Sequence, residues 1–76
     1  MKIAVIIPTY NEAASIGSLI DLLEEELKKI PKHEFNILVV DANSPDGTAG
    51  IVREKSKTYH NIELFVETGR RGLGAA

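Results

Sequence analysis

Three short apolar runs alternate with two amphipathic stretches in this chain, and this alternation constrains the fold more than any other feature. The apolar runs cover Ile3 to Ile7, Ile37 to Val40 and Ile62 to Val66. Runs of this length that contain Ile and Val are typical of buried strands. Strands that alternate with helices form right-handed crossovers between parallel neighbours. We therefore predict an α/β fold, a βαβαβ unit with three parallel strands in the spatial order 3-2-1.

Helical periodicity marks the two intervening stretches. In the first, apolar residues recur at steps of three and four residues from Ala13 to Ile30. Charged pairs four residues apart would face solvent on the opposite side: Glu24 with Lys28, and Glu25 with Lys29. We expect Asn11 to cap this helix and Pro31 to stop it. The polar connector of residues 32–36 then leads to the second strand.

Prolines and capping residues predict the other element boundaries. Pro8 cannot donate a hydrogen bond to a sheet ladder, so the first strand should end there. Ser44 resembles a helix N-cap, with Pro45 in the first helical position and Asp46 complementing the helix dipole. The second helix should run to about Thr58.

In this topology both crossover helices lie on one face of the sheet. The other face and the free edge of the first strand have no cover in the sequence, although the strands have the composition of strands buried on both sides. We expect the chain to self-associate or to lack a C-terminal half.

Size and composition exclude several classes of function. With 76 residues, the chain can bury only a marginal core. Its net charge of −2, with both signs mixed, argues against nucleic acid as a partner. The absence of cysteine rules out disulfides and Cys-type zinc sites. The five apolar residues after Met1-Lys2 are too few for a signal peptide or a membrane span. We expect a cytoplasmic protein.

Asp41 is the first candidate for chemistry. It follows a buried strand and precedes a helix, at the carboxyl edge where α/β folds bind ligands. Its carboxylate could accept from a ribose hydroxyl or a base N–H, and we favour this role over the alternative of a turn-capping Asp. Asn43 and Ser44 are better explained as turn residues. One carboxylate and one amide in Asp41-Ala42-Asn43 make a poor Mg²⁺ or Mn²⁺ site.

Two further loops carry candidates. After the first strand, Tyr10 could stack on a base and Glu12 could hold a ribose, although both also fit ordinary helix punctuation. Near the C-terminus, Gly72, Leu73 and Gly74 could cradle a diphosphate through backbone N–H groups, with Arg70 and Arg71 supplying charge, although such segments are often plain loops. His33 and His60 lack partners at ligand spacing, and we expect them at the surface.

Read together, three segments resemble the family 2 glycosyltransferases: Val5 to Glu12, Val39 to Thr48 and Arg71 to Ala76. The Ser-Pro-Asp-Gly-Thr turn at 44–48 and the Gly-Leu-Gly segment look most like the dolichol-phosphate mannosyltransferase branch and its polyprenyl-phosphate relatives. The resemblance covers essentially the whole chain.

The resemblance implies a GT-A type, Rossmann-like half-domain that holds a GDP- or UDP-sugar for transfer to a lipid phosphate or another hydroxyl acceptor. Pro8, Tyr10 and Glu12 would then line the base and ribose, and Asp41 would hold the base. The family usually has a second aspartate where this chain has Ala42. Losing that acceptor costs a nucleotide about 1–3 kcal/mol if no neighbour replaces it.

The family's divalent-cation ligands and its catalytic base lie further along, beyond Ala76. Sugar transfer needs both the cation, Mg²⁺ or Mn²⁺, and the base. We therefore interpret residues 1–76 as the N-terminal, nucleotide-sugar-binding part of a truncated family 2 domain, inactive alone, with no catalytic residue. The full enzyme would work in the cytoplasm, at the cytoplasmic face of a membrane if its acceptor is a lipid phosphate.

Other classes fit less well. A dinucleotide-binding dehydrogenase half needs Gly-x-Gly-x-x-Gly after the first strand, where this chain has a lone Gly17. A phosphoacceptor signalling domain needs acids at the end of the first strand, where this chain has Pro8. A small non-enzymatic α/β protein that acts through its exposed sheet face stays open as the alternative.

Overall fold

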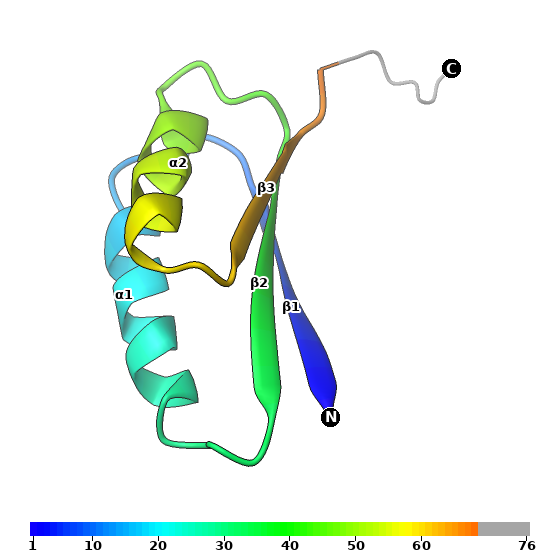
Figure 1. The fold of residues 1–76 in the computed structure, drawn as a ribbon. Helices are drawn as coiled ribbons and strands as arrows, with labels where there is room; N and C mark the ends of the chain where they lie inside the picture. Colours follow the sequence, from blue (N-terminus) through cyan, green and yellow to red (C-terminus); the bar gives the residue numbers. More distant parts are fainter. Residues whose placement is uncertain (69–76) are drawn as a thin grey trace.

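The chain alternates between strand and helix along its whole described length, which in this computed structural model is residues 1–68 (Figure 1). Its elements are β1 (Lys2–Thr9), α1 (Ile16–Leu27), β2 (Glu34–Asp41), α2 (Thr48–Thr58) and β3 (Ile62–Val66). The predicted bounds of β3 and the predicted end of α2 at Thr58 are confirmed.

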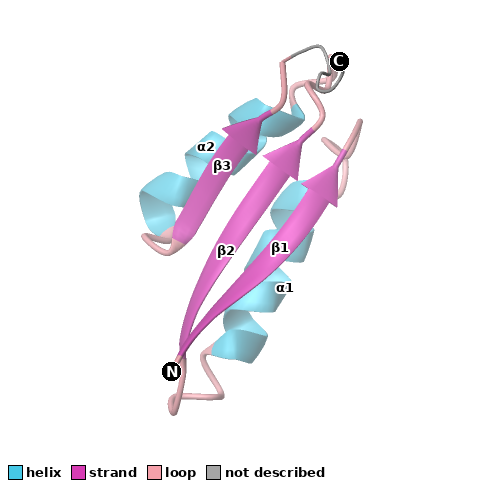
Figure 2. Ribbon diagram, turned by 90° about the vertical axis from the view of Figure 1, so that its right-hand side faces the viewer, coloured by secondary structure: helices cyan, strands magenta, loops and turns pink. Residues whose placement is uncertain are grey.

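The three strands form one parallel sheet with β2 in the middle. Val5 of β1 lies opposite Ile37, and Ile37 lies opposite Ile62 of β3. Both helices cover the same face of the sheet (Figures 1 and 2). The predicted α/β fold and the strand order 3-2-1 are therefore confirmed.

The core lies between this face and the two helices. Its fully or almost fully buried apolar residues come from four elements: Ile16 and Ile20 of α1, Ile37 and Val39 of β2, Val52 of α2, and Ile62 of β3. Val39 and Ile37 are two residues apart, as residues on one face of a strand must be, whereas Ile16 and Ile20 are one helical turn apart. The core is thus built from the two-residue repeat of the strands and the three- to four-residue repeat of the helices, as expected from the sequence.

The prediction that β1 ends at Pro8 is wrong, because the strand continues to Thr9. Ala42 N donates to Thr9 O at 3.0 Å, so the backbone polar groups of Thr9 face β2. Since neighbouring residues of a strand point their backbone groups in opposite directions, the nitrogen of Pro8 faces the free edge of the sheet. A proline there removes no ladder hydrogen bond.

The predicted beginning of the first helix is also wrong. Regular helix α1 begins at Ile16 with Ser15 in the N-cap position, and Asn11 lies instead in the left-handed region with φ of 55°. Helix α1 ends at Leu27, before Pro31. The predicted pairs four residues apart do not form, and Lys29 pairs with Glu26 at 3.2 Å, whereas Glu24 accepts from Asn61 at 3.3 Å.

Helix α2 begins later than predicted. Gly47, with φ of 91°, occupies the N-cap position, and Thr48 is the first helical residue. Ser44 and Pro45 therefore lie in the turn before the helix, and Ser44 does not cap it. Asp46 Oδ1 accepts from Thr48 N at 3.1 Å, so the predicted role of Asp46 at this helix N-terminus fits the observed contact.

An ion pair joins the two helices. Lys55 Nζ donates to both carboxylate oxygens of Asp21, at 2.9 and 2.8 Å, and Tyr59 Oη donates to Asp21 Oδ1 at 2.8 Å. The hydrogen bonds from Lys55 and Tyr59 lower the pKa of Asp21, and the bond to Asp21 raises the pKa of Tyr59. Close by, Gly17 lies against Ile51 and the Lys55 stem, where an added Cβ would make ordinary van der Waals contacts at 3.5 Å.

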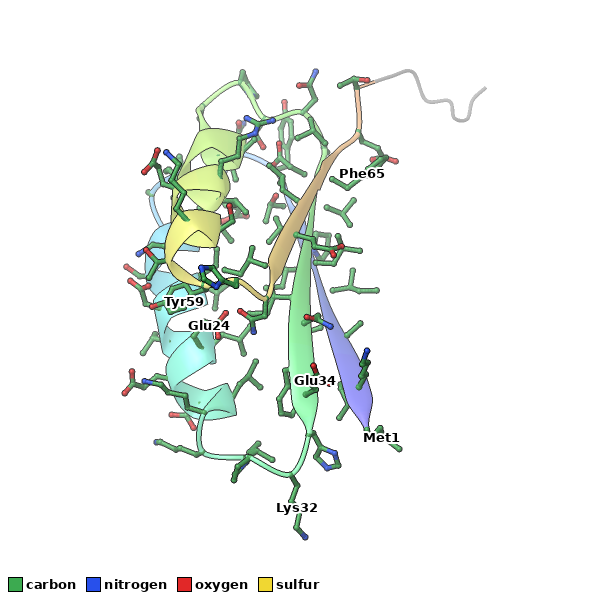
Figure 3. All side chains as sticks on the ribbon, in the orientation of Figure 1. Met1, Glu24, Lys32, Glu34, Tyr59 and Phe65 are labelled. Atoms are coloured by element: carbon green, nitrogen blue, oxygen red, sulfur yellow. The ribbon has the colours of Figure 1, made fainter. Side chains whose placement is uncertain are left out.

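Within residues 1–68, the face of the sheet away from the helices is open, and it is apolar toward the carboxyl ends of the strands. Ile6 is 61% exposed and Phe65 is 56% exposed, and Leu38 and Val40 lie between them in the register. Figure 2 looks onto this face, and in Figure 3 Phe65 projects on the side away from the helices. The uncovered face predicted from the sequence is thus present in the part of the chain that the structure describes. Among residues 1–68, no helix is long and apolar enough to cross a membrane.

Candidate functional site

The carboxyl ends of all three strands lie at one edge of the sheet, at the top of Figure 1. Thr9, the last residue of β1, lies opposite Asp41, the last residue of β2. The loop after β1 and the loop after β2 therefore start side by side. This is the edge at which α/β sheets bind their ligands.

Asp41 is the centre of this edge. Its side chain is fully buried, and its carboxylate accepts three hydrogen bonds, from Thr9 Oγ1 at 2.7 Å, from Ser44 Oγ at 2.7 Å and from Ser44 N at 2.8 Å. Burial raises the pKa of the Asp41 carboxyl, but the hydrogen bonds from Ser44 and Thr9 outweigh burial and hold that pKa below its ordinary value of 3.8. Asp41 is therefore a charged group whose partners come from the end of β1 and from the loop after β2.

The loop after β2 also holds the loop after β1 through three side chains, Ser44, Asp46 and Thr48, which we call the clamp residues. Each accepts from one of three successive backbone N–H groups: Asn11 N donates to Ser44 Oγ at 2.9 Å, Glu12 N to Thr48 Oγ1 at 3.0 Å, and Ala13 N to Asp46 Oδ2 at 3.0 Å. The clamp residues thus satisfy donors that precede α1 and have no partner in their own segment.

The clamp residues also bind one another. Thr48 Oγ1 donates to Asp46 Oδ1 at 2.5 Å. This bond and the one from Ala13 N hold the pKa of Asp46 below its ordinary value of 3.8, so Asp46 stays ionised at neutral pH. An ionised carboxylate is a stronger acceptor for a backbone N–H than a neutral oxygen is, which favours the observed loop geometry.

The predicted site residues of the first loop lie at this edge. Tyr10 is 53% exposed, so its ring is accessible, and Pro8 lies exposed on the open face of the sheet. The Glu12 carboxylate accepts from Ser15 Oγ at 3.2 Å and is exposed. The structure thus brings Tyr10 and Glu12 together with the Asp41 turn. The predicted glycine-rich loop at Gly72, Leu73 and Gly74 lies outside the described residues.

Sequence reasoning missed two functional candidates, Thr9 and Thr48, which are both buried polar residues. The sequence places Thr9 in the loop after the first strand and Thr48 at the end of the Ser-Pro-Asp-Gly-Thr turn, and neither residue was assigned a role. A usable signal was present, because one hydroxyl comes at the end of an apolar strand and the other at the end of Ser-Pro-Asp-Gly-Thr, at the expected start of the second helix. Such groups need buried partners.

The residues of this edge do not fit a divalent cation by themselves. Among residues 1–68, no three His, Asp or Glu side chains gather as a possible metal site. The one strand-end carboxylate, Asp41, already accepts from two hydroxyls and one backbone N–H. A cation needs several free oxygen ligands, and this turn does not offer them.

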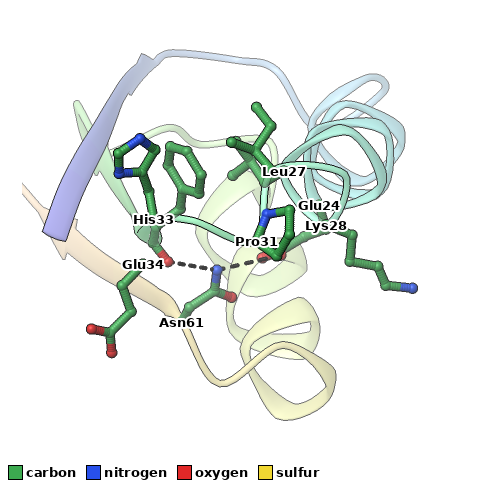
Figure 4. Close-up of a pocket in the computed structure, with 9 residues that line it drawn as sticks. Glu24, Leu27, Lys28, Pro31, His33, Glu34 and Asn61 are labelled. Atoms are coloured by element: carbon green, nitrogen blue, oxygen red, sulfur yellow. Dashed lines mark hydrogen bonds between the residues drawn. The ribbon is translucent and has the colours of Figure 1, made fainter. Parts of the chain in front are cut away.

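A hollow lies at the opposite end of the sheet, where α1 ends and β2 begins (Figure 4). It has a volume of about 290 Å³. Asn61 Nδ2 bridges its walls by donating to Glu24 Oε1 at 3.3 Å and Phe35 O at 3.0 Å. Two buried atoms there, Glu24 Oε2 and His33 Nδ1, have no hydrogen-bond partner among residues 1–68, and the hollow has room for water to satisfy them. His33 also packs edge-on against Phe35 and is half-buried, so it is less exposed than predicted, whereas His60 is exposed.

The fold and this edge define an α/β protein that presents two interlocked loops at the carboxyl ends of parallel strands. The model of the family described as glycosyl transferase family 2 matches residues 4–76. The chain belongs to this family, which confirms the family inferred from the three sequence motifs.

Known relatives agree with this assignment. The chain is 36% identical to the dolichol-phosphate mannosyltransferase of Pyrococcus furiosus over 76 residues, which are 100% of this chain and 20% of that protein. It also resembles the solved structure of mannosyl-3-phosphoglycerate synthase from Rubrobacter xylanophilus, with a TM-score of 0.74 and 32% identity, over 100% of this chain and 23% of that one.

A further solved structure is the mannosyltransferase PcManGT from Pyrobaculum calidifontis in complex with GDP-Man and Mn²⁺. Its TM-score is 0.57 and its identity 38%, over 92% of this chain and 20% of that one. The chain spans no more than about a quarter of the length of the first curated relatives it matches, at 24% and 20%.

Proposed function

We propose that residues 1–76 are the N-terminal, nucleotide-sugar-binding part of a glycosyltransferase. The enzyme would move a hexose, mannose or glucose, from a GDP- or UDP-sugar to a polyprenyl or dolichyl phosphate or to another hydroxyl acceptor. The observation that carries this proposal is the edge at which the loop of Tyr10 and Glu12 is bound to the turn of Asp41. The mannosyltransferase that binds GDP-Man supports the donor class, and the dolichol-phosphate relative supports the acceptor class.

Within this proposal, each residue has a stated task. The exposed Tyr10 ring stacks on the base, and Pro8 and Glu12 line the base and ribose. Because Asp41 has no exposed surface, its direct contact with the base requires exchange of one of its three hydrogen bonds for one from the ligand. Gly72, Leu73 and Gly74 are proposed to bind the diphosphate.

The proposed reaction also needs groups that these residues do not supply. A divalent cation would neutralise the leaving diphosphate, and a carboxylate base would deprotonate the acceptor hydroxyl. Since no group of His, Asp or Glu side chains that could hold a metal gathers among residues 1–68, we propose that the chain alone binds a donor but transfers no sugar. The cytoplasmic location stays a prediction.

Calorimetric titration of the chain with GDP-mannose and UDP-glucose, each with Mn²⁺, tests the binding. We expect saturable binding of one donor, and heat no larger than dilution for both donors would refute the proposal. A mass-detected transfer assay with a polyprenyl phosphate tests the second part. Turnover by the chain alone would contradict the proposed lack of catalysis.

A second candidate function rests on the open sheet face. Ile6 and Phe65 expose apolar surface next to Leu38 and Val40, which fits a small non-enzymatic protein that binds a partner or its own copy through this face. Analytical ultracentrifugation distinguishes the cases. A monomer that binds neither a hydrophobic dye nor a second copy would exclude this candidate.

A further inference from the structure

The clamp residues bind the backbone of the loop after β1, which carries Tyr10 and Glu12. Asn11, Glu12 and Ala13 are consecutive, and each gives its backbone N–H to a different clamp residue at 2.9 to 3.0 Å. Three successive contacts fix both the position and the orientation of this short segment relative to the loop after β2, because a single hydrogen bond would still allow the segment to rotate about it.

The clamp itself is anchored in the core. Thr48 is fully buried at the start of α2, and Ser44 Oγ donates to Asp41, which is also fully buried. Asn11 has φ of 55°, in the left-handed region that is uncommon for non-glycine residues, although asparagine enters it more readily than most. The hydrogen bond to Ser44 restrains Asn11 in this conformation.

From this geometry we propose that Ser44, Asp46 and Thr48 are positioning residues for nucleotide recognition. They hold the backbone of residues 11–13, and through it they set the direction in which Tyr10 and Glu12 face the nucleotide. The inference rests on the proposed donor binding, and it assigns to the Ser-Pro-Asp-Gly-Thr segment a role in the neighbouring loop in addition to the start of its own helix. Loop order before binding reduces the entropy cost of holding the base.

The test replaces Thr48 with valine, which keeps the shape of the side chain and removes the oxygen that accepts from Glu12 N. Thr48→Ser is the rescue variant, because it keeps the hydroxyl. Thr58→Val is the matched control, because it makes the same change at an exposed position at the end of α2. Circular dichroism first establishes that each variant is folded.

Two measurements are then compared. Amide hydrogen exchange of Glu12, followed by NMR without ligand, should be about tenfold faster in Thr48→Val, the factor that corresponds to a hydrogen bond of about 1.4 kcal/mol. The affinity for GDP-mannose or UDP-glucose with Mn²⁺, measured by calorimetry, should fall about tenfold. Thr48→Ser and Thr58→Val should stay within about twofold of the wild type in both measurements.

The outcomes separate the inference from the function on which it rests. Unchanged exchange in folded Thr48→Val overturns the clamp, and faster exchange with unchanged affinity overturns its role in recognition. If the wild type binds neither donor, the proposed function fails and the recognition role fails with it, although exchange still reports whether the clamp holds the loop. If Thr48→Val does not fold, Ser44→Ala gives the same readouts at Asn11.

Discussion

Replacing Asp41 with alanine should destabilise the chain by about 2–4 kcal/mol, because it leaves three donors without their shared acceptor. Hydrogen bonds to a charged group contribute about 1.5–3 kcal/mol each, so the gross loss is roughly 5–9 kcal/mol. The variant no longer buries a carboxylate, which returns several kcal/mol of desolvation. The net loss is a large part of the roughly 4–11 kcal/mol expected for 76 residues.

Urea unfolding followed by circular dichroism measures this loss by linear extrapolation. Asp41→Asn is the graded variant, since it keeps the volume and one acceptor oxygen and should lose less than Asp41→Ala. Glu54→Gln is the control, because Glu54 is an exposed carboxylate on α2, and it should stay within about 0.5 kcal/mol of the wild type. If Asp41→Ala also stays within that margin, the buried carboxylate does not hold the two loops together.

The pH dependence gives an independent check on Asp41. Its folded pKa lies below the ordinary value of 3.8, so its stabilising effect is fully present above that value and is lost as the pH falls through the folded pKa. The difference in unfolding free energy between the wild type and Asp41→Asn should therefore be constant near neutral pH and shrink on acidification below 3.8. A difference that grows on acidification would contradict the charged, hydrogen-bonded state.

Three further predictions concern other parts of the fold. Lys55→Met should lower the urea midpoint at neutral pH, because it removes the ion pair with Asp21. Since Lys55 lowers the pKa of Asp21 in the folded chain, the difference in midpoint from the wild type should narrow as the pH falls below the ordinary Asp21 pKa of 3.8. A difference in midpoint that does not depend on pH would argue against the ion pair. Phe65→Ser should reduce the fluorescence of a bound hydrophobic dye and leave the urea midpoint nearly unchanged, because Phe65 is 56% exposed. A loss of more than about 1 kcal/mol in the free energy of unfolding would mean that the ring is packed. Gly47→Ala should lower the free energy of unfolding by about 1–2 kcal/mol, because the φ of Gly47 is 91°. Gly50→Ala, inside α2, should raise the free energy of unfolding by about 0.5–1 kcal/mol. Equal effects of the two substitutions in urea unfolding would refute this difference.

Local sequence patterns were sufficient to predict the bounds of those elements that depend least on contacts with other parts of the fold. The strand Ile62–Val66 and the end of α2 at Thr58 follow from composition and periodicity, and the strand order follows from the handedness of crossovers. The error at Pro8 has a different origin. A proline ends a strand only if its nitrogen faces a neighbour, and sequence alone does not say which edge of β1 is free.

The errors at the helix starts have one common cause. Ser44 and Asn11 were assigned as caps of the helices that follow them, according to the usual local rule. In the folded chain, Ser44 instead accepts from Asn11 N, 33 residues away, so each residue serves the contact between the two loops. Local rules describe helix ends, but they do not describe a turn whose side chains satisfy a neighbouring loop.

The position of Pro8 also bears on how this sheet can grow. Met1 O accepts from Glu34 N and Thr9 O from Ala42 N, on the β2 side of the strand. The alternate residues of β1 therefore direct their backbone groups to the free edge: Lys2, Ala4, Ile6 and Pro8. A strand that added to this edge would find N–H donors at the first three and only a carbonyl at Pro8. The proline thus acts as a gatekeeper that limits edge-to-edge aggregation at the end of the strand nearest the candidate site.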